Sequence, residues 1–273
     1  MRVGVGAGRE DDRPVQAGEM SELQQSLFLE IFELLPRQGP GSEAATLKAL
    51  AMCDGLPPGP RVLDLGCGSG AQTLDLAVHT RGLVMAVDAH APLVEKLQAR
   101  IERARLADRV HAMVADMGSL DLPEGEFDLI WSEGALYNVG IPAGLALAER
   151  LLVPAGYLVF SEPVWRTAEL NDEVRSAFED YAAMGTVDEA IEEIARADWE
   201  LVGHFELPAS AWWDDFYTPL EQRIAEYRER YRDDMQALEA LELVAREPAM
   251  HRESGWMYGY EFFVARRPAT PKM

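Results

Sequence analysis

The sequence predicts an α/β protein whose sheet is doubly wound, mostly parallel and covered by helices on both faces. From residue 62 onward, short runs of apolar and β-branched residues alternate with segments whose apolar residues recur at helical spacing. Such alternation builds β-α-β units, which make neighbouring strands parallel and place helices on both sides of the sheet. The strand-like runs lie at residues 62–65, 83–87, 110–114, 127–131, 157–161 and 201–207, and the helical segments at about 71–80, 91–106, 142–152, 168–183 and 187–197.

The segment before the first strand predicts a leader followed by a helical cap. Residues 1–19 are rich in glycine and charge without a periodic apolar face, so we expect a disordered leader. Ser21 and Gln24 predict a capping box at the start of a helix that stops at Pro36. Ser42 predicts the start of a second helix, which runs to about Met52. We expect residues 20–41 to cap the site and residues 42–273 to form the main domain.

The C-terminal part changes character. Residues 218–246 predict one long charged helix, and the aromatic-rich residues 256–265 predict a final strand, antiparallel and at the edge of the sheet. Alternation along this strand predicts that Trp256, Tyr258 and Tyr260 share one face and belong to the core. We expect residues 208–255, a loop and the long helix, to lie on the substrate side.

Composition excludes several classes of function. With 47 acidic and 25 basic side chains among 273 residues, the formal charge of −22 repels phosphate backbones, which disfavours a nucleic-acid substrate. The two cysteines and five scattered histidines lack the spacing of a disulfide framework or a metal site, so we expect no metal. The sequence has no apolar run of the roughly 20 residues needed to span a bilayer. We expect a cytoplasmic protein without membrane partners, as a monomer or a homodimer.

The strongest motif is VLDLGCGSGAQTLDLA, residues 62–77. Gly66, Gly68 and Gly70 follow a strand and precede a helix, where glycine lets the backbone approach a ligand closely. A dinucleotide loop of the form GxGxxG/A is nominally matched too, by Gly66, Gly68 and Ala71. Asp64 favours an S-adenosylmethionine site over a dinucleotide site. Its carboxylate would repel a pyrophosphate and attract the α-ammonium group of S-adenosylmethionine.

Two further acidic residues follow the next two strands. Asp88 ends the second strand, where a carboxylate can accept hydrogen bonds from both ribose hydroxyls. Asp116 follows the third strand and could accept from an adenine amino group, with Met117 packing on the ring. Each aspartate alone could be a helix N-cap. Three of them at the carboxyl ends of successive strands predict a ligand site at that edge of the sheet.

Together with these residues, FDLIWSEGALYN and PAGYLVFSE resemble the successive motifs of class I S-adenosylmethionine-dependent methyltransferases over about residues 40–205. More narrowly, RQGPGS and WSEGALYNVG are similar to bacterial small-molecule methyltransferases related to ubiquinone/menaquinone C-methyltransferases. The resemblance implies a seven-stranded sheet with an antiparallel last strand and S-adenosylmethionine as the cofactor. We expect cofactor contacts at Asp64, Gly66, Cys67, Gly68, Gly70, Asp88, Ala89, Asp116, Met117, Ser132 and Glu133, and from the cap at Gln38 and Gly39.

The loop after the fourth strand, residues 132–138, is expected to face the transferred methyl group. Its Glu133, Tyr137 and Asn138 could position or deprotonate a nucleophile, although Tyr137 and Asn138 could equally satisfy only their own loop. The loop carries neither an N/D-P-P-Y/F motif nor a Pro-Cys nucleophile, which argues against methylation of nucleic-acid bases.

Aromatic residues predict where the acceptor binds. We expect substrate contacts from Tyr137, Trp165, Trp212, Trp213 and Tyr217, with the two adjacent tryptophans in a loop that forms a wall or lid.

The sequence thus predicts methyl transfer from S-adenosylmethionine to an N, O, S or C nucleophile of a small molecule. Two alternatives stay open, an NAD(P)-binding oxidoreductase and a catalytically silent S-adenosylmethionine-binding protein. Glu162 and His204, near strand ends, are further candidates for a base.

Overall fold

The computed structural model describes residues 21–179, 181 and 184–269, so the leader predicted for residues 1–19 lies outside it. Seven strands form one sheet in the order β3-β2-β1-β4-β5-β7-β6. Neighbours from β3 to β5 pair in parallel, and β7 is antiparallel to both β5 and β6. The strands are β1 (Arg61–Leu65), β2 (Leu83–Asp88), β3 (Val110–Val114), β4 (Phe127–Glu133), β5 (Leu152–Trp165), β6 (Glu200–Glu206) and β7 (Tyr258–Arg266). The predicted fold class is confirmed.

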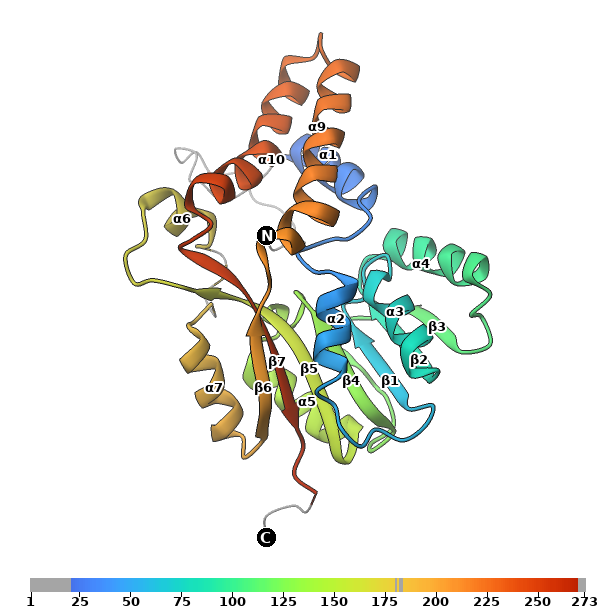
Figure 1. The fold of residues 1–273 in the computed structure, drawn as a ribbon. Helices are drawn as coiled ribbons and strands as arrows, with labels where there is room; N and C mark the ends of the chain where they lie inside the picture. The colour runs from blue at the N-terminus through green and yellow to red at the C-terminus, as the bar shows by residue number, and fades with distance from the viewer. Residues whose placement is uncertain (1–20, 180, 182–183, 270–273) are drawn as a thin grey trace.

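Helices cover both faces of the sheet and form a separate layer beyond one end of it (Figure 1). The helices are α1 (Glu22–Glu33), α2 (Glu43–Leu50), α3 (Ala71–Thr80), α4 (Ala91–Ala104), α5 (Ile141–Leu151), α6 (Asp172–Ala177), α7 (Val187–Arg196), α8 (Ala209–Trp212), α9 (Thr218–Arg230) and α10 (Met235–Ser254). Short helical turns are η1 (Met117–Ser119), η2 (Leu136–Asn138) and the π-helical η3 (Trp213–Tyr217). Within the described ranges, no helix is long and apolar enough to cross a membrane.

Each face of the sheet has its own core because successive side chains of a strand point to opposite faces. On one face, α2, α3 and α4 pack on the sheet, and Leu76 and Leu97 are fully buried there. On the other face, α5 and α7 pack over Ile130 and Phe160. Because both faces are covered, all but one residue of β1 and all but two of β4 are buried.

The third core belongs to the layer beyond the sheet, which we call the helical cap and which comprises α1, α6, α8, η3, α9 and α10. Leu27 and Ile31 of α1 pack with Ile224 of α9 and Leu241 of α10. Figure 1 shows α1, α9 and α10 side by side above the carboxyl ends of the strands. The predicted capping box of Ser21 and Gln24 begins α1, so this start signal is confirmed.

Several predictions for the C-terminal part are wrong. The stretch predicted as one helix is two, because Asp234 starts α10 afresh by accepting from the N–H groups of Gln236 and Ala237. Helix α6 occupies only six residues of the predicted 168–183 segment. Trp256 precedes β7 and is 64% exposed, whereas Tyr258 is buried as predicted.

The position of β7 also differs from the prediction. It lies between β5 and β6, and β6 forms the edge of the sheet. The burial of the two strands explains this order. All but two residues of β7 are buried, whereas β6 alternates between exposed and half-buried residues. A strand with two neighbours and two covered faces is apolar throughout, and an edge strand is not.

Candidate cofactor and acceptor site

The glycine loop after β1 is packed so closely that only glycine fits. Gly66 has a φ of +72°, and a Cβ there would overlap the Cβ of Ala135. Its N–H and that of Cys67 donate to the carbonyl of Val87, at 2.8 and 3.0 Å. At Gly70, which has a φ of +82°, a Cβ would overlap the side chain of Leu97. The loop is therefore held between β2, α4 and the turn after β4, in one conformation that leaves its backbone close to a ligand.

Cys67 is buried inside this loop, and burial raises the pKa of its thiol well above the ordinary value. The thiol therefore stays protonated and packs against the apolar core of the α2–α4 face.

Asp88 is held against the glycine loop at the carboxyl end of β2. Parallel pairing of β1 with β2 aligns Leu65 with Val87, so the two strand ends meet. One oxygen of Asp88 accepts the N–H of Gly68 and the other that of His90, both at 2.8 Å. Ala89 lies between these two contacts in the chain. Because a carboxylate can accept about four hydrogen bonds, each oxygen keeps a lone pair for a ligand hydroxyl.

Asp64 lies beneath the loop instead of facing outward. It is fully buried, and its two oxygens accept hydrogen bonds from Thr73 Oγ1 at 2.5 Å and Gln72 Nε2 at 3.3 Å. Burial raises the pKa of Asp64 to about 7. Both oxygens are directed at the start of α3, so this residue fixes the helix that follows the loop. Sequence reasoning missed Gln72 and Thr73 as its partners.

Asp116 and Met117 follow β3, but their side chains make different contacts. Asp116 is exposed and accepts from the N–H of Gly118 at 2.9 Å, which makes it the N-cap of η1. Met117 comes closer, since its methyl carbon is 3.4 Å from the position of a Cβ on Gly66. The N-cap alternative is therefore realised for Asp116, and any ligand contact by it stays a prediction.

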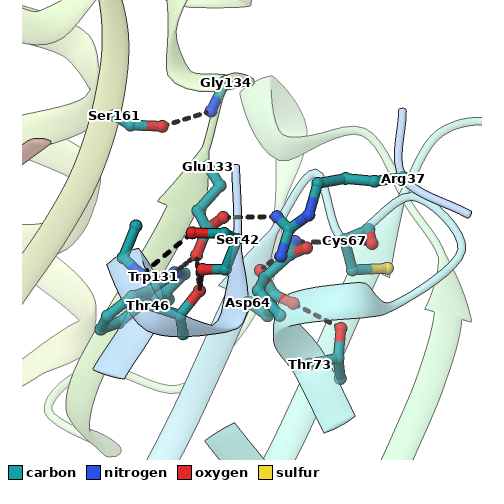
Figure 2. Close-up of polar contacts among 12 residues, drawn as sticks. Arg37, Ser42, Thr46, Asp64, Cys67, Thr73, Trp131, Glu133, Gly134 and Ser161 are labelled. Atoms are coloured by element: carbon teal, nitrogen blue, oxygen red, sulfur yellow. Dashed lines mark hydrogen bonds and ion pairs between the residues drawn. The ribbon is translucent and has the colours of Figure 1, made fainter. Parts of the chain in front are cut away.

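Glu133, at the end of β4, forms a buried ion pair with Arg37 (Figure 2). Arg37 Nη1 and Glu133 Oε2 are 2.6 Å apart, and the two side chains are 7% and 2% exposed. The other oxygen of Glu133 accepts from Thr46 Oγ1 at 2.7 Å and Trp131 Nε1 at 2.9 Å. With three donors on its carboxylate, Glu133 ties the segment after α1 to the sheet and is not a free base.

The segment between α1 and α2 lies over the glycine loop. Gln38 Oε1 accepts the N–H of Ser69 at 2.8 Å, while its amide donates to carbonyls at the end of α1. Gly41 leaves room for Arg37, because a Cβ there would lie 2.5 Å from Arg37 Nη1. No atom lies within 4 Å of a Cβ on Gly39, so this position is open. The signal for Arg37 was present in the RQGPGS motif, but only the fold shows its partner.

The turn η2 brings Tyr137 and Asn138 above β5. The N–H of Tyr137 donates to Glu162 Oε1 at 2.9 Å, and burial raises the pKa of Glu162 to about 8. Asn138 Nδ2 donates to the carbonyl of Ala135 at 2.8 Å, so this amide satisfies its own loop. Burial raises the pKa of Tyr137 to about 12, so its phenol is neutral at physiological pH. Tyr137 can therefore donate a hydrogen bond but is a poor proton acceptor.

The remaining residues near β4 and β6 have structural partners. Ser132 is buried, and its hydroxyl donates to the carbonyl of Leu65 at 3.0 Å. His204 Nδ1 lies 2.6 Å from Glu261, away from the glycine loop in the sheet order. In the part of the chain that the structure describes, no group of three or more His, Cys, Asp or Glu side chains is placed to hold a metal.

Of the predicted substrate-binding aromatic residues, Trp212, Trp213 and Tyr217 lie together in α8 and η3, whereas Trp165 lies at the end of β5. Trp212 and Trp213 are helical, so their prediction as a loop is wrong. Trp212 is buried and stacks on His251 with ring centroids 4.2 Å apart, and Tyr217 is buried beside it. Trp213 lies under the guanidinium of Arg252, 4.6 Å from ring centroid to Cζ. Trp165 donates from its indole nitrogen to the carbonyl of Met184 at 2.9 Å.

Comparison with known proteins identifies the family. A family model described as a methyltransferase domain matches residues 57–223. The 27-O-demethylrifamycin SV methyltransferase of Amycolatopsis mediterranei is 27% identical over 241 residues, which cover 83% of this chain and 85% of that protein. A second match is partial. The chain spans only 38% of an uncharacterised transposon protein of Streptomyces fradiae, to which it is 36% identical over 135 residues, 48% of this chain.

Solved structures show the same fold. A methyltransferase from Geobacter sulfurreducens in complex with S-adenosyl-L-homocysteine superposes with a TM-score of 0.76 at 21% identity, covering 90% of this chain and 98% of that one. The [4+2]-cyclase SpnF superposes with a TM-score of 0.70 at 19% identity, covering 91% and 93%. The match to the cyclase shows that this fold also occurs in a protein whose name states a different reaction.

The family match covers more than half of the chain and includes the glycine loop, Asp88, Met117 and Glu133. The sheet order and the antiparallel β7 agree with it. The chain therefore belongs to the family of class I S-adenosylmethionine-dependent methyltransferases.

Proposed function

We propose that this chain binds S-adenosylmethionine at the carboxyl ends of β1, β2 and β4 and transfers its methyl group to a small-molecule acceptor. The observation that carries the proposal is the pairing of Asp88 with the glycine loop, described above. When bound, this cofactor supplies an electrophilic methyl carbon: an acceptor lone pair forms a bond to it, the carbon–sulfur bond breaks, and its electron pair stays on sulfur.

Residues around the loop fit the parts of the cofactor. The free lone pairs of Asp88 suit the two ribose hydroxyls, and Met117 beside Gly66 supplies an apolar surface for the adenine. Arg37 supplies a positive charge that suits the cofactor carboxylate. A guanidinium has five N–H donors, and the ion pair with Glu133 uses Nη1, so donors on the other nitrogens remain for the cofactor. Gln38 and the N–H groups of the loop complete the enclosure.

We assign positioning, not proton transfer, to the residues of the β4 loop. Glu133 holds Arg37 and Asn138 holds its own turn, so Tyr137 is the residue whose hydroxyl can orient an acceptor. Alignment of donor and acceptor, together with exclusion of water by the segment over the loop, supplies much of the rate in such a transfer. A base is required only for acceptors that lose their proton in the slow step.

The acceptors of related proteins support a small molecule. The printed names of relatives include a dimethylglycine N-methyltransferase, which is 31% identical over 116 residues, and an arsenite methyltransferase, which is 36% identical over 140 residues. Both names describe small acceptors. The acidic character of this chain, with a formal charge of −22, is consistent with that class and disfavours nucleic acid.

The first experiment separates this proposal from an NAD(P)-dependent oxidoreductase. S-adenosylhomocysteine at a hundred times its dissociation constant should raise the free energy of unfolding by about 2.7 kcal/mol, and NAD⁺ should leave it unchanged. The carboxylate of Asp88, held against the loop, disfavours a pyrophosphate there. Stabilisation by NAD⁺ alone would contradict the proposal.

A second experiment tests methyl transfer itself. The protein is incubated with S-adenosylmethionine and a panel of metabolites, and methylated products are detected by mass spectrometry. Formation of a methylated product with release of S-adenosylhomocysteine supports an enzyme. Cofactor binding without turnover on any acceptor would favour the silent binding protein.

With an acceptor in hand, Tyr137→Phe tests the positioning role. The variant keeps the ring that packs 5.0 Å from Tyr181 and removes only the hydroxyl. Turnover should fall about ten- to a thousandfold while affinity for S-adenosylhomocysteine holds. Tyr231→Phe, in the break between α9 and α10, is the control. Equal turnover of both variants would remove Tyr137 from the proposed site.

A further inference from the structure

The segment between α1 and α2 closes over the end of the site where the cofactor carboxylate is proposed to lie. We call residues 36–41 of this segment the strap. The strap contains Arg37, whose side chain is 7% exposed, and Arg37 in turn covers Glu133, whose side chain is 2% exposed. At the other end of the site, Asp88 is half-buried and Asp116 is exposed. Solvent therefore reaches the ribose and adenine end of the site, but the strap closes the Arg37 end.

Three polar contacts hold the strap to three different parts of the molecule. The ion pair of Arg37, at 2.6 Å, joins it to the end of β4. Gln38 Oε1 accepts the N–H of Ser69 at 2.8 Å, which joins the strap to the glycine loop. The N–H of Gly41 donates to the carbonyl of Ala211 at 3.0 Å, which joins it to α8 of the helical cap. The strap is therefore fixed from outside, by contacts that a local movement would break together.

A ligand cannot reach Arg37 from this side while the strap lies in this position. Gln38 Oε1 would be 2.8 Å from a Cβ on Gly68, which leaves no room for another atom between the strap and the glycine loop at that point. Residues 36–41 form neither helix nor strand, so few bonds resist their local opening. Opening also exposes Arg37 and Glu133 to water together, so neither charge is left buried alone.

We propose that the strap is a gate for the cofactor, which opens to admit the amino-acid end of S-adenosylmethionine and then closes over it. The Arg37–Glu133 pair is the latch of this gate. The inference rests on the proposed function and adds how the same site is entered and left. When the strap closes, it brings the Arg37 guanidinium onto the cofactor carboxylate. Because each exchange of cofactor waits for the strap to open, the strap sets the rates of association and dissociation.

Two glycines of the strap allow a matched test, because only one of them touches the latch. A Cβ on Gly41 would lie 2.5 Å from Arg37 Nη1 and 3.0 Å from Glu133 Oε2, whereas no atom lies within 4 Å of a Cβ on Gly39. Neither glycine has a positive φ, so the backbone accepts alanine at both positions. Gly41→Ala therefore displaces the guanidinium and weakens the latch, and Gly39→Ala is the control.

Surface plasmon resonance with S-adenosylhomocysteine on the immobilised full chain measures both rates. Gly41→Ala should raise the association and dissociation rate constants by about three- to thirtyfold each, because a weaker latch leaves the strap open more often. Gly39→Ala should change neither rate constant by more than about twofold. Loss of a cofactor contact alone would speed dissociation and leave association unchanged. A faster association is therefore the result specific to a gate.

An association rate constant that does not rise in folded Gly41→Ala would overturn the inference, and thermal unfolding shows whether the variant is folded. If it is not, Gln38→Ala takes its place under the same criterion, since it removes the contact with Ser69 and leaves the latch intact. Failure of the parent protein to bind S-adenosylhomocysteine contradicts the proposed function. Binding by the parent without faster association in the variant contradicts this inference alone.

Discussion

The glycine loop in the cofactor half of the sheet and the helical cap are built from contacts of very different range. At the loop, Asp64 binds Thr73 nine residues later, and Gly68 binds Asp88 twenty residues later. In the cap, the hydroxyl of Tyr227 donates to Glu30, 197 residues away, at 2.7 Å. Short-range contacts leave a pattern that a sequence shows directly, whereas contacts across the whole chain do not.

Carboxylates in the molecule also differ in burial and in whether they have a cationic partner. The joint between the two regions buries Glu133 with a matching Arg37, while the cap leaves Glu247 exposed and without an ion pair in the described ranges. Removing one partner from a buried pair leaves an uncompensated charge, but an exposed carboxylate costs little to keep. The buried pair therefore suits a fixed structural joint.

The largest effect is expected from the joint between the two regions. Arg37→Met leaves the Glu133 carboxylate buried without its cation, and we expect the free energy of unfolding to fall by about 3–5 kcal/mol. Urea denaturation measures this loss. The double variant Arg37→Met/Glu133→Gln should recover much of it, because no charge is then buried alone. A loss below about 1 kcal/mol in the single variant would show that the cap is not anchored there.

Gly66→Ala should act within the cofactor half alone. The positive φ and the overlap with Ala135 together should lower the free energy of unfolding by about 2–4 kcal/mol and weaken S-adenosylhomocysteine binding. Gly125→Ala is the matched control, since its φ is +62° but no atom lies within 4 Å of a Cβ there. Equal losses in the two variants would mean that close packing of the loop contributes nothing.

Asp88→Ala should change binding more than stability. Loss of charge-assisted hydrogen bonds to the ribose costs about 1.5–3 kcal/mol, which corresponds to about ten- to hundredfold weaker binding of S-adenosylhomocysteine by calorimetry. Asp121→Ala, an exposed aspartate after η1, should bind as the parent does. Unchanged affinity in a folded Asp88→Ala protein would contradict the assignment of the ribose site.

A further effect is a pH dependence of stability. Glu162 has an ordinary pKa of 4.5 that burial raises to about 8, so between these values the folded chain holds a proton that the unfolded chain releases. The free energy of unfolding should therefore fall as the pH rises from about 5 to 8, by at most about 1.4 kcal/mol per pH unit for this group. Asp64, with a pKa raised to about 7, adds a slope of the same sign.

Glu162→Gln keeps an acceptor for the N–H of Tyr137 and removes the titration. Thermal melts across this pH range should show a shallower slope for Glu162→Gln than for the parent. Glu192→Gln, on the exposed side of α7, controls for the loss of one carboxyl group. An identical slope in Glu162→Gln and the parent would show that Glu162 does not titrate in this range.

The sequence by itself determined the α/β class, the helix start at Ser21 and the glycine loop, because each depends on a local pattern: alternation, a capping box, or glycines between a strand and a helix. It did not determine that β7 lies inside the sheet; in the structure all but two residues of β7 are buried, whereas β6 alternates between exposed and half-buried residues. Propensity describes one strand at a time, and strand order depends on which neighbours bury each face.

Only the tertiary structure decided which side chains meet. It paired Arg37 with Glu133, turned Asp64 toward α3, and joined Tyr217 to Glu247, 30 residues away in the chain. The physical reason is that a carboxylate has the same sequence signature whether it meets a guanidinium, a helix start or solvent. Its partner is set by packing of the whole chain, and that partner decides whether the residue is a structural joint or part of a binding site.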